Sequence, residues 1–137
     1  MNKSLLFIIS QVRYLVFAAL LSLFCVYANG QILINEFSAS NSMLISDPDF
    51  GDYSDWIELY NAGTETVNLN GYYLSDNYNS PSRFTITGDF MVDPDEHIII
   101  WADGRDTALH ASFKLSSLGE QIGIYGSVLG VVDTVSF

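Results

Sequence analysis

The chain has 137 residues, of which 49% are hydrophobic and 14% aromatic, and its net charge is −11 at neutral pH. This length suits one domain of ordinary size and is too short for two. So acidic a chain has few Lys and Arg side chains to neutralise phosphates, and we therefore expect no nucleic-acid partner.

Residues 1–30 predict a signal peptide helix. Lys3 and Arg13 are the only charged residues there, and residues 15–26 read LVFAALLSLFCV, which is apolar except for one serine. A membrane-spanning helix needs about 20 apolar residues, whereas a run of about a dozen is typical of a signal peptide. We therefore expect the protein to be secreted or held at the cell surface, with membrane contact only through this segment during export.

The end of this segment predicts the cleavage site. Small residues follow the apolar run, and we expect cleavage after Gly30 because the β pattern begins at Gln31. Cleavage after Ala28 and an uncleaved N-terminal anchor are the alternatives. Phe24 is too bulky for the position before a lipoprotein cysteine, so Cys25 does not indicate a lipid anchor.

The predicted mature chain, residues 31–137, is one acidic domain without cysteine. It holds all sixteen acidic residues but only three basic ones, Arg83, Arg105 and Lys114, which gives it a net charge of −13. A domain of this size buries roughly 60–70% of its unfolded surface, so it can fold without disulfides.

The mature chain predicts an all-β fold. Short runs of β-branched and aromatic residues recur between Gly, Asn, Asp, Pro and Ser, with no helical period. These runs predict strands at residues 32–37, 56–60, 72–75, 83–86, 97–101, 112–115, 121–125 and 131–135. Seven to eight short strands at this spacing indicate a β-sandwich or a small barrel.

Two runs predict how their strands are buried. In residues 56–60, Ile57 and Leu59 share one face, and Trp56, Glu58 and Tyr60 share the other. Residues 97–101 are apolar after His97, which favours a central strand covered on both faces.

The acidic loop at residues 47–58 is the main candidate site. Carboxylates fall at its positions 1, 3, 6, 9 and 12, close to the spacing of an EF-hand calcium loop. It is not an EF-hand, because Asp52 stands where that loop needs glycine. We predict an irregular calcium site that uses Asp47, Asp49 and Asp52; a solvent-facing turn without an ion is the alternative.

No other residues indicate catalysis. Glu36 and Glu58 more simply occupy the wetter face of a sheet, or pair with Arg83 or Lys114, than form an acid–base pair. His97 and His110 lack the spaced partners of a zinc site, and the sequence shows no nucleophile or phosphate-binding motif. We expect no cofactor besides calcium, and no enzyme activity.

Aromatic residues crowd the acidic stretch and suggest a binding surface. Such side chains can stack on sugar rings or contact a protein, although they more often cover the core. They are Phe50, Tyr53, Tyr72, Tyr73 and Tyr78.

Several segments, in order, resemble the lamin tail domain, an immunoglobulin-like β-sandwich. They are WIELYNAG at 56–63, NGYYLSD at 70–76, FMVDPDEHIIIWADG at 90–104 and LGEQIGI at 118–124. The bacterial, secreted branch is the closer match, because it commonly opens with INEF, as at 34–37, and continues through an acidic loop into DWIEL, as at 55–59. That branch usually continues past the point equivalent to Phe137, so the resemblance implies that residues 31–137 are truncated at the C-terminal end.

The resemblance implies a role in interaction rather than in catalysis. We expect an exported, non-catalytic attachment module of a cell-surface or secreted protein, with a protein or polysaccharide ligand outside the cell. The alternative is an N-terminal accessory domain of a larger secreted enzyme, a hydrolase or a spore-coat kinase-like protein, whose catalytic part lies outside this chain.

Overall fold

The computed structural model describes residues 32–126 and 130–137. The predicted signal peptide and its cleavage site lie outside the described residues. Within these ranges, no helix has the length and apolarity needed to cross a membrane.

The described residues form nine β-strands and no helix, which confirms the all-β prediction. The first and last strands in the chain have seven residues each, and three of the strands between them have only two. The strands are β1 (Ile32–Ser38), β2 (Asp55–Asn61), β3 (Val67–Asn68), β4 (Tyr73–Ser75), β5 (Phe84–Thr85), β6 (Met91–Val92), β7 (His97–Ala102), β8 (Gln121–Gly126) and β9 (Gly130–Ser136).

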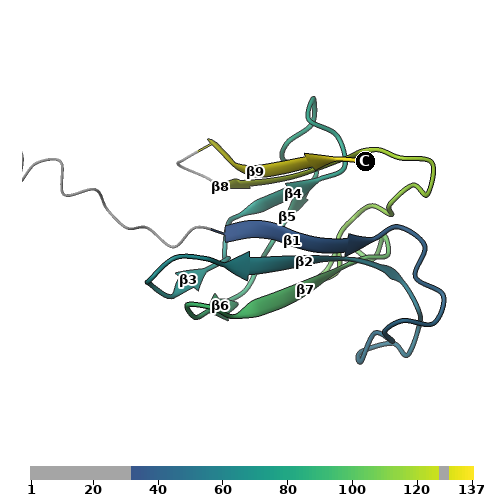
Figure 1. Cartoon of the computed structure of the whole chain (residues 1–137), viewed down its shortest axis with the longest axis horizontal. Coiled ribbons are helices and arrows are strands. Elements are labelled where there is room, and N and C mark those ends of the chain that lie inside the picture. Colours follow the sequence, from purple (N-terminus) through teal and green to yellow (C-terminus); the bar gives the residue numbers. More distant parts are fainter. Residues whose placement is uncertain (1–31, 127–129) are drawn as a thin grey trace, which may run out of the picture.

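Two antiparallel sheets form the layers of a β-sandwich (Figure 1). One sheet has the order β1-β2-β7, the other has the order β5-β4-β8-β9, and β3 pairs with β6 as a small third sheet. The strands' inner faces meet in one hydrophobic core that includes Ile57 and Ile100 from the first sheet and Leu74 and Ile124 from the second. This arrangement confirms the predicted immunoglobulin-like sandwich.

The alternation in β2 is confirmed and explains its place in the sandwich. Ile57 and Leu59 are fully buried in the core. Trp56 is on the opposite face but is only 6% exposed. Since apolar residues on the outer face are also covered, another part of the chain must pack over this sheet.

Some predicted strand positions are wrong. Residues 112–115 form no strand; Lys114 makes only an isolated bridge to Asp103 as this segment crosses between the sheets. The two-residue strands β3 and β6 were not predicted, because two residues are too short for any alternation to show.

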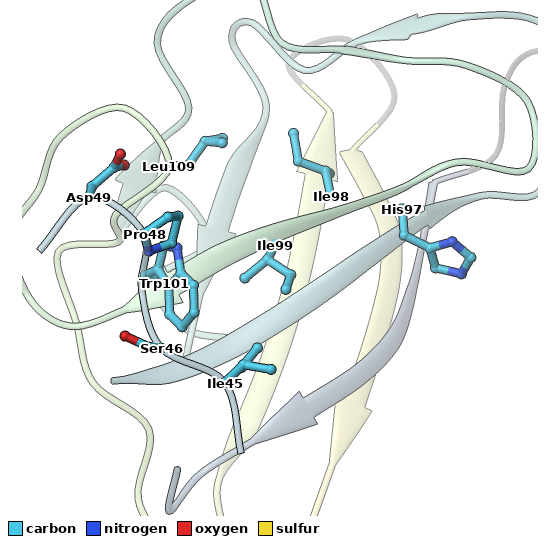
Figure 2. A pocket seen from close by; sticks show the side chains of 9 residues that line it. All are labelled: Ile45, Ser46, Pro48, Asp49, His97, Ile98, Ile99, Trp101 and Leu109. Atoms are coloured by element: carbon cyan, nitrogen blue, oxygen red, sulfur yellow. The ribbon is translucent and has the colours of Figure 1, made fainter. Parts of the chain in front are cut away.

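The prediction that residues 97–101 form a central strand is also wrong. In its sheet β7 is an edge strand, and β2 is central. The second half of β7 is nevertheless buried on both faces: its inner face packs in the core, and on the outer face Trp101 is 5% exposed and lines one pocket with Ile45, Ser46, Pro48 and Asp49 of the loop between β1 and β2 (Figure 2). The continuous apolar run reflects this two-sided burial and not a central position.

The other edge of this sheet is closed against the second sheet. The backbone N–H of Ile34 in β1 donates a hydrogen bond of 2.8 Å to Asp133 Oδ2 in β9. The rings of Phe37 and Phe137 lie 4.3 Å apart, centroid to centroid, at the same seam. A side-chain carboxylate on a backbone N–H blocks strand pairing there, so β7 is the more accessible edge of this sheet.

Candidate functional site

The β1–β2 loop folds around two buried polar side chains. Asn41 donates from Nδ2 to the carbonyl oxygens of Ile45 (2.6 Å) and Ser54 (2.8 Å), and it accepts from the N–H of Leu44 (3.0 Å). A buried amide that satisfies three backbone groups holds the loop in one shape, because leaving those groups unpaired is costly.

Asp47 organises the second half of the loop. Its N–H donates to the carbonyl of Asp52, and its own carbonyl accepts from Gly51, both at 2.8 Å. Its Oδ1 accepts from the N–H of Asp49 at 2.9 Å, an Asx turn. The side chain is fully buried, so this acidic turn packs inward and is not simply solvent-facing.

The chain that follows β7 turns back on itself and returns His110 to the strand. The N–H of Trp101 donates to the carbonyl of Leu109, and the N–H of Ala111 donates to the carbonyl of Trp101. The reversal needs left-handed backbone, with φ of 84° at Gly104, 58° at Asp106 and 47° at Ala108. His110 therefore lies beside Asp103 at the end of β7.

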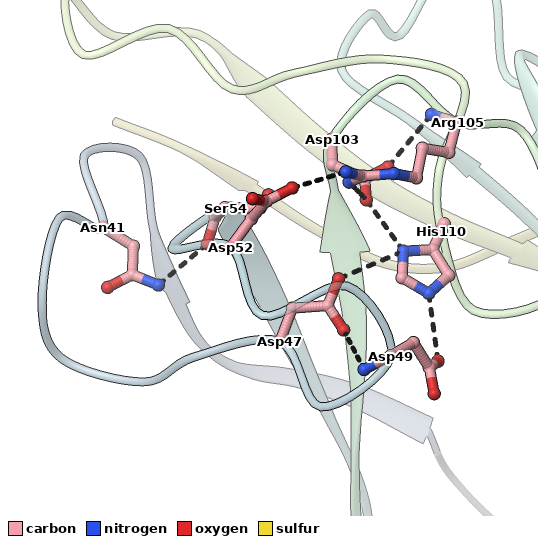
Figure 3. A network of polar contacts seen from close by, with 8 residues as sticks. All are labelled: Asn41, Asp47, Asp49, Asp52, Ser54, Asp103, Arg105 and His110. Carbon is pink, nitrogen blue, oxygen red and sulfur yellow. Dashed lines mark hydrogen bonds and ion pairs between the residues drawn. The ribbon is translucent and has the colours of Figure 1, made fainter.

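The two loops meet at His110 (Figure 3). Its Nδ1 lies 2.8 Å from Asp103 Oδ2 and 3.7 Å from Asp47 Oδ2, and its Nε2 lies 3.2 Å from Asp49 Oδ2. Arg105 adds ion pairs to Asp103 and Asp52. The result is a cluster in which Asp47, Asp103 and His110 are buried while Asp49 and Asp52 face solvent.

The cluster shifts the pKa values of two members in opposite directions. Burial alone would lower the pKa of His110, but hydrogen bonds with Asp103 and Asp49 and the nearby negative charges raise it overall. Burial alone would raise the pKa of Asp103, but hydrogen bonds from the Arg105 N–H and from the His110 and Arg105 side chains lower it overall. A charged His110 and an ionised Asp103 thus support one another.

The structure divides the predicted calcium ligands between different partners. Asp47 points inward to His110, Asp49 contacts the other nitrogen of that ring, and Asp52 pairs with Arg105. The three carboxylates come from one turn, as the spacing indicated, but they do not face a common point. A calcium site at these residues stays a prediction.

Sequence reasoning missed the importance of His110, Asp103 and Arg105. His110 was set aside because it has no His or Cys partner at a short spacing, and its partners are aspartates from two loops. One signal was available: an Asp-Gly turn directly after the buried strand, with a histidine seven residues later.

The remaining carboxylate candidates, Glu36 and Glu58, lie side by side on β1 and β2. Glu36 is exposed and lies opposite Glu58, which accepts from Asn35 Nδ2 (2.7 Å) and lies 3.9 Å from His97. The wetter-face prediction is therefore confirmed for Glu36. The alternative pairing with Arg83 is wrong, because Arg83 pairs with Asp76.

The structure gives the aromatic residues of the predicted surface different surroundings. Tyr78 bonds to the carbonyl of Val135, Tyr72 packs on the core, and Phe50 lies edge-on to His110 and under Arg105. Phe50 and Tyr53 are each 51% exposed, and an aromatic binding surface stays a prediction.

An open groove of about 550 Å³ runs between the β1–β2 loop and β7 (Figure 2). Its polar lining residues are Ser46, Asp49 and His97. Its apolar lining residues are Ile45, Pro48, Ile98, Ile99, Trp101 and Leu109. Asp49 lines the groove and also contacts His110. The groove therefore adjoins the cluster of aspartates around His110, the Asp–His cluster.

The two-layer sandwich defines an immunoglobulin-like domain. The model of the Lamin Tail Domain family matches residues 26–137, and the chain belongs to this family of immunoglobulin-like, non-enzymatic interaction modules. No curated protein matches the chain significantly.

Proposed function

We propose that this chain is an exported attachment module that holds an extended segment of a partner protein along the edge of β7 at Ile99. The observation that carries the proposal is the apolar groove at that edge. A strand edge with unpaired backbone groups and side-chain pockets beside it is one of the recurring ways in which proteins bind peptides.

The backbone of β7 supports edge pairing. Both backbone groups of Trp101 bond away from β2, to residues 109 and 111. Because backbone groups alternate in direction along an antiparallel strand, those of Ile99 also point away from β2. Among the residues described, no backbone hydrogen bond occupies the outer side of Ile99. A partner strand could therefore continue the sheet there.

The groove walls favour a peptide over a polysaccharide. Ile45, Ile99 and Leu109 are aliphatic, and the ring of Trp101 is only 5% exposed, too covered to stack on a sugar. Aliphatic pockets beside a strand edge suit alternate side chains of an extended peptide.

Charge favours a basic partner segment. Asp49 lines the groove with its side chain 68% exposed, and Glu58 lies opposite Ile99 in the strand register. Residues 31–137 carry a net charge of −13. Complementary charge speeds encounter and selects partners, so we expect Lys or Arg between the aliphatic residues of the bound segment.

A peptide of alternating valine and lysine is expected to bind the purified protein and to change its tryptophan fluorescence, because Trp101 lines the groove. Ile99→Ala is expected to weaken binding at least about fivefold by truncating the wall at the centre of the edge. Fluorescence titration measures both affinities.

Three controls separate edge pairing from general attraction. Val131→Ala, at a 63% exposed β-branched residue on β9, should leave affinity unchanged. The same peptide N-methylated at alternate residues should not bind, since it cannot pair, and a valine–glutamate peptide should bind more weakly. Equal binding of the N-methylated peptide, or binding of an oligosaccharide instead, would contradict the proposal.

Export is supported by the apolar run at 15–26 and the small residues after it. The chain expressed in a bacterial host with residues 1–30 is expected outside the cytoplasm, beginning at Gln31. Leu20→Arg should retain it inside by interrupting the apolar run. Mass spectrometry of the recovered protein is the measurement, and a cytoplasmic product with residues 1–30 intact would contradict the prediction.

A further inference from the structure

We infer that Asp47, Asp103 and His110 form a binding site for a divalent transition-metal ion of the zinc class, where the β1–β2 loop meets the end of β7. One ligand atom from each residue lies within 4.8 Å of the others, and all three residues are buried. Metal binding here does not depend on what binds in the β7 groove.

The first support is an oxygen without a partner. Asp47 is 0% exposed, and no described residue donates a hydrogen bond to its Oδ2. This atom points at the His110 ring, 3.7 Å from Nδ1 (Figure 3). Buried carboxylate oxygens nearly always have a hydrogen-bond donor or a bound ion, and a metal between Asp47 and His110 would supply one.

The second support is the spacing of the ligand atoms. Two ligands on a tetrahedral zinc ion, each about 2.1 Å from it, lie about 3.4 Å apart. His110 Nδ1 lies 2.8 Å from Asp103 Oδ2 and 3.7 Å from Asp47 Oδ2, on either side of that value. The ligand atoms of Asp47 and Asp103 lie within 4.8 Å of each other. Small side-chain movements would bring the three atoms around one ion, which would replace the proton on Nδ1.

The third support is that each ligand is already held by a neighbour. His110 contacts Asp49 through Nε2, the nitrogen that would face away from the metal. Asp47 Oδ1 accepts from the N–H of Asp49, and Asp103 Oδ1 accepts from the N–H of Arg105 at 3.0 Å. Metal-binding histidines usually donate their other ring N–H to a carboxylate or carbonyl, and ligating carboxylates are likewise hydrogen-bonded.

The ligand chemistry selects the class of ion. Calcium prefers six to eight oxygen ligands, whereas an imidazole with two carboxylates suits zinc or cobalt, with a fourth position for water. Four carboxylates converge here on one guanidinium and one imidazole, so a divalent cation also balances charge.

Cobalt titration of the purified, chelator-treated protein tests the site. Co²⁺ in a tetrahedral site of this kind is expected to give visible absorption bands that Zn²⁺ abolishes by competition. His110→Gln and Asp47→Asn should each weaken Co²⁺ binding at least about 100-fold, because each removes a direct ligand.

Matched variants identify the ligands. His97→Gln removes the chain's only other histidine, which is on the surface, and should leave binding within about twofold. Asp52→Asn should do the same, whereas it would abolish binding if the ion sat among Asp47, Asp49 and Asp52. Histidine nitrogen NMR should show Zn²⁺ at Nδ1 of His110, and this readout does not require the variants to fold.

Absence of the absorption bands at millimolar Co²⁺ would overturn the inference. So would coordination through Nε2, or equal loss of binding in the His97 and His110 variants. Tighter binding of Ca²⁺ than of Zn²⁺ would also overturn the inference, and it would support the predicted calcium site at Asp47, Asp49 and Asp52 instead.

Discussion

Replacing Trp101 with alanine is expected to destabilise the protein by about 3–5 kcal/mol. Trp101 is 5% exposed, lies opposite Trp56 in the β2–β7 register and packs beneath the β1–β2 loop. Truncating a buried tryptophan loses its apolar burial and leaves a cavity, and this combination typically costs that much. Urea unfolding of the variant and the parent protein measures the difference in unfolding free energy.

The control for this change is an exposed apolar residue. Leu118 is 96% exposed, so Leu118→Ala should change stability by less than about 0.5 kcal/mol. A loss below about 1 kcal/mol for Trp101→Ala would mean that the outer face of β7 is not covered by the loop.

Replacing Asn61 with alanine is expected to cost about 3 kcal/mol although it removes only a small polar group. Asn61 is 0% exposed, and its Nδ2 donates to the carbonyls of Glu65 and Val92, each at 2.8 Å. Its Oδ1 accepts from the N–H of Gly63 at 2.9 Å. Alanine leaves these backbone groups without their partner, and each buried one costs about 1–3 kcal/mol.

Asn77 offers a matched comparison. It forms the same kind of Asx turn, accepting from the N–H of Asn79 at 2.9 Å, but it is exposed, so water can replace the side chain. Asn77→Ala should therefore cost less than about 1 kcal/mol in the same unfolding experiment. Equal losses at Asn61 and Asn77 would show that burial of the amide does not set the cost.

The fold was largely predictable because its long strands carry their own pattern. The alternation around Ile57 and Leu59 sets the register of β2, and Asn-Gly at residues 70–71 marks a turn in which Gly71 has a φ of 83°. Such local signals survive in the structure because each agrees with the global packing.

Position within a sheet was less predictable. The apolar run of β7 indicates burial on both faces. Such burial occurs in a central strand and equally in an edge strand beneath a loop. Burial alone does not distinguish them. The open edge that supports the proposed function therefore became visible only with the sheet order.

The Asp–His cluster was hidden for a different reason. Asp47 and His110 are 63 positions apart, and they meet only because the loop after β7 reverses through left-handed residues at Asp106 and Ala108. No periodic pattern encodes that reversal. Spacing along one loop grouped Asp47 with Asp52, whereas the fold brought it to His110.

The location of a bound valine–lysine peptide tests the proposed function most directly. Backbone amide NMR of the protein, with and without the peptide, is expected to show changes centred on residues 97–101 and on the facing residues 45–49. Ile99 should show the largest shift because its backbone groups would pair with the peptide. Changes centred on β9 or β5, or none at millimolar peptide, would contradict attachment through the β7 edge.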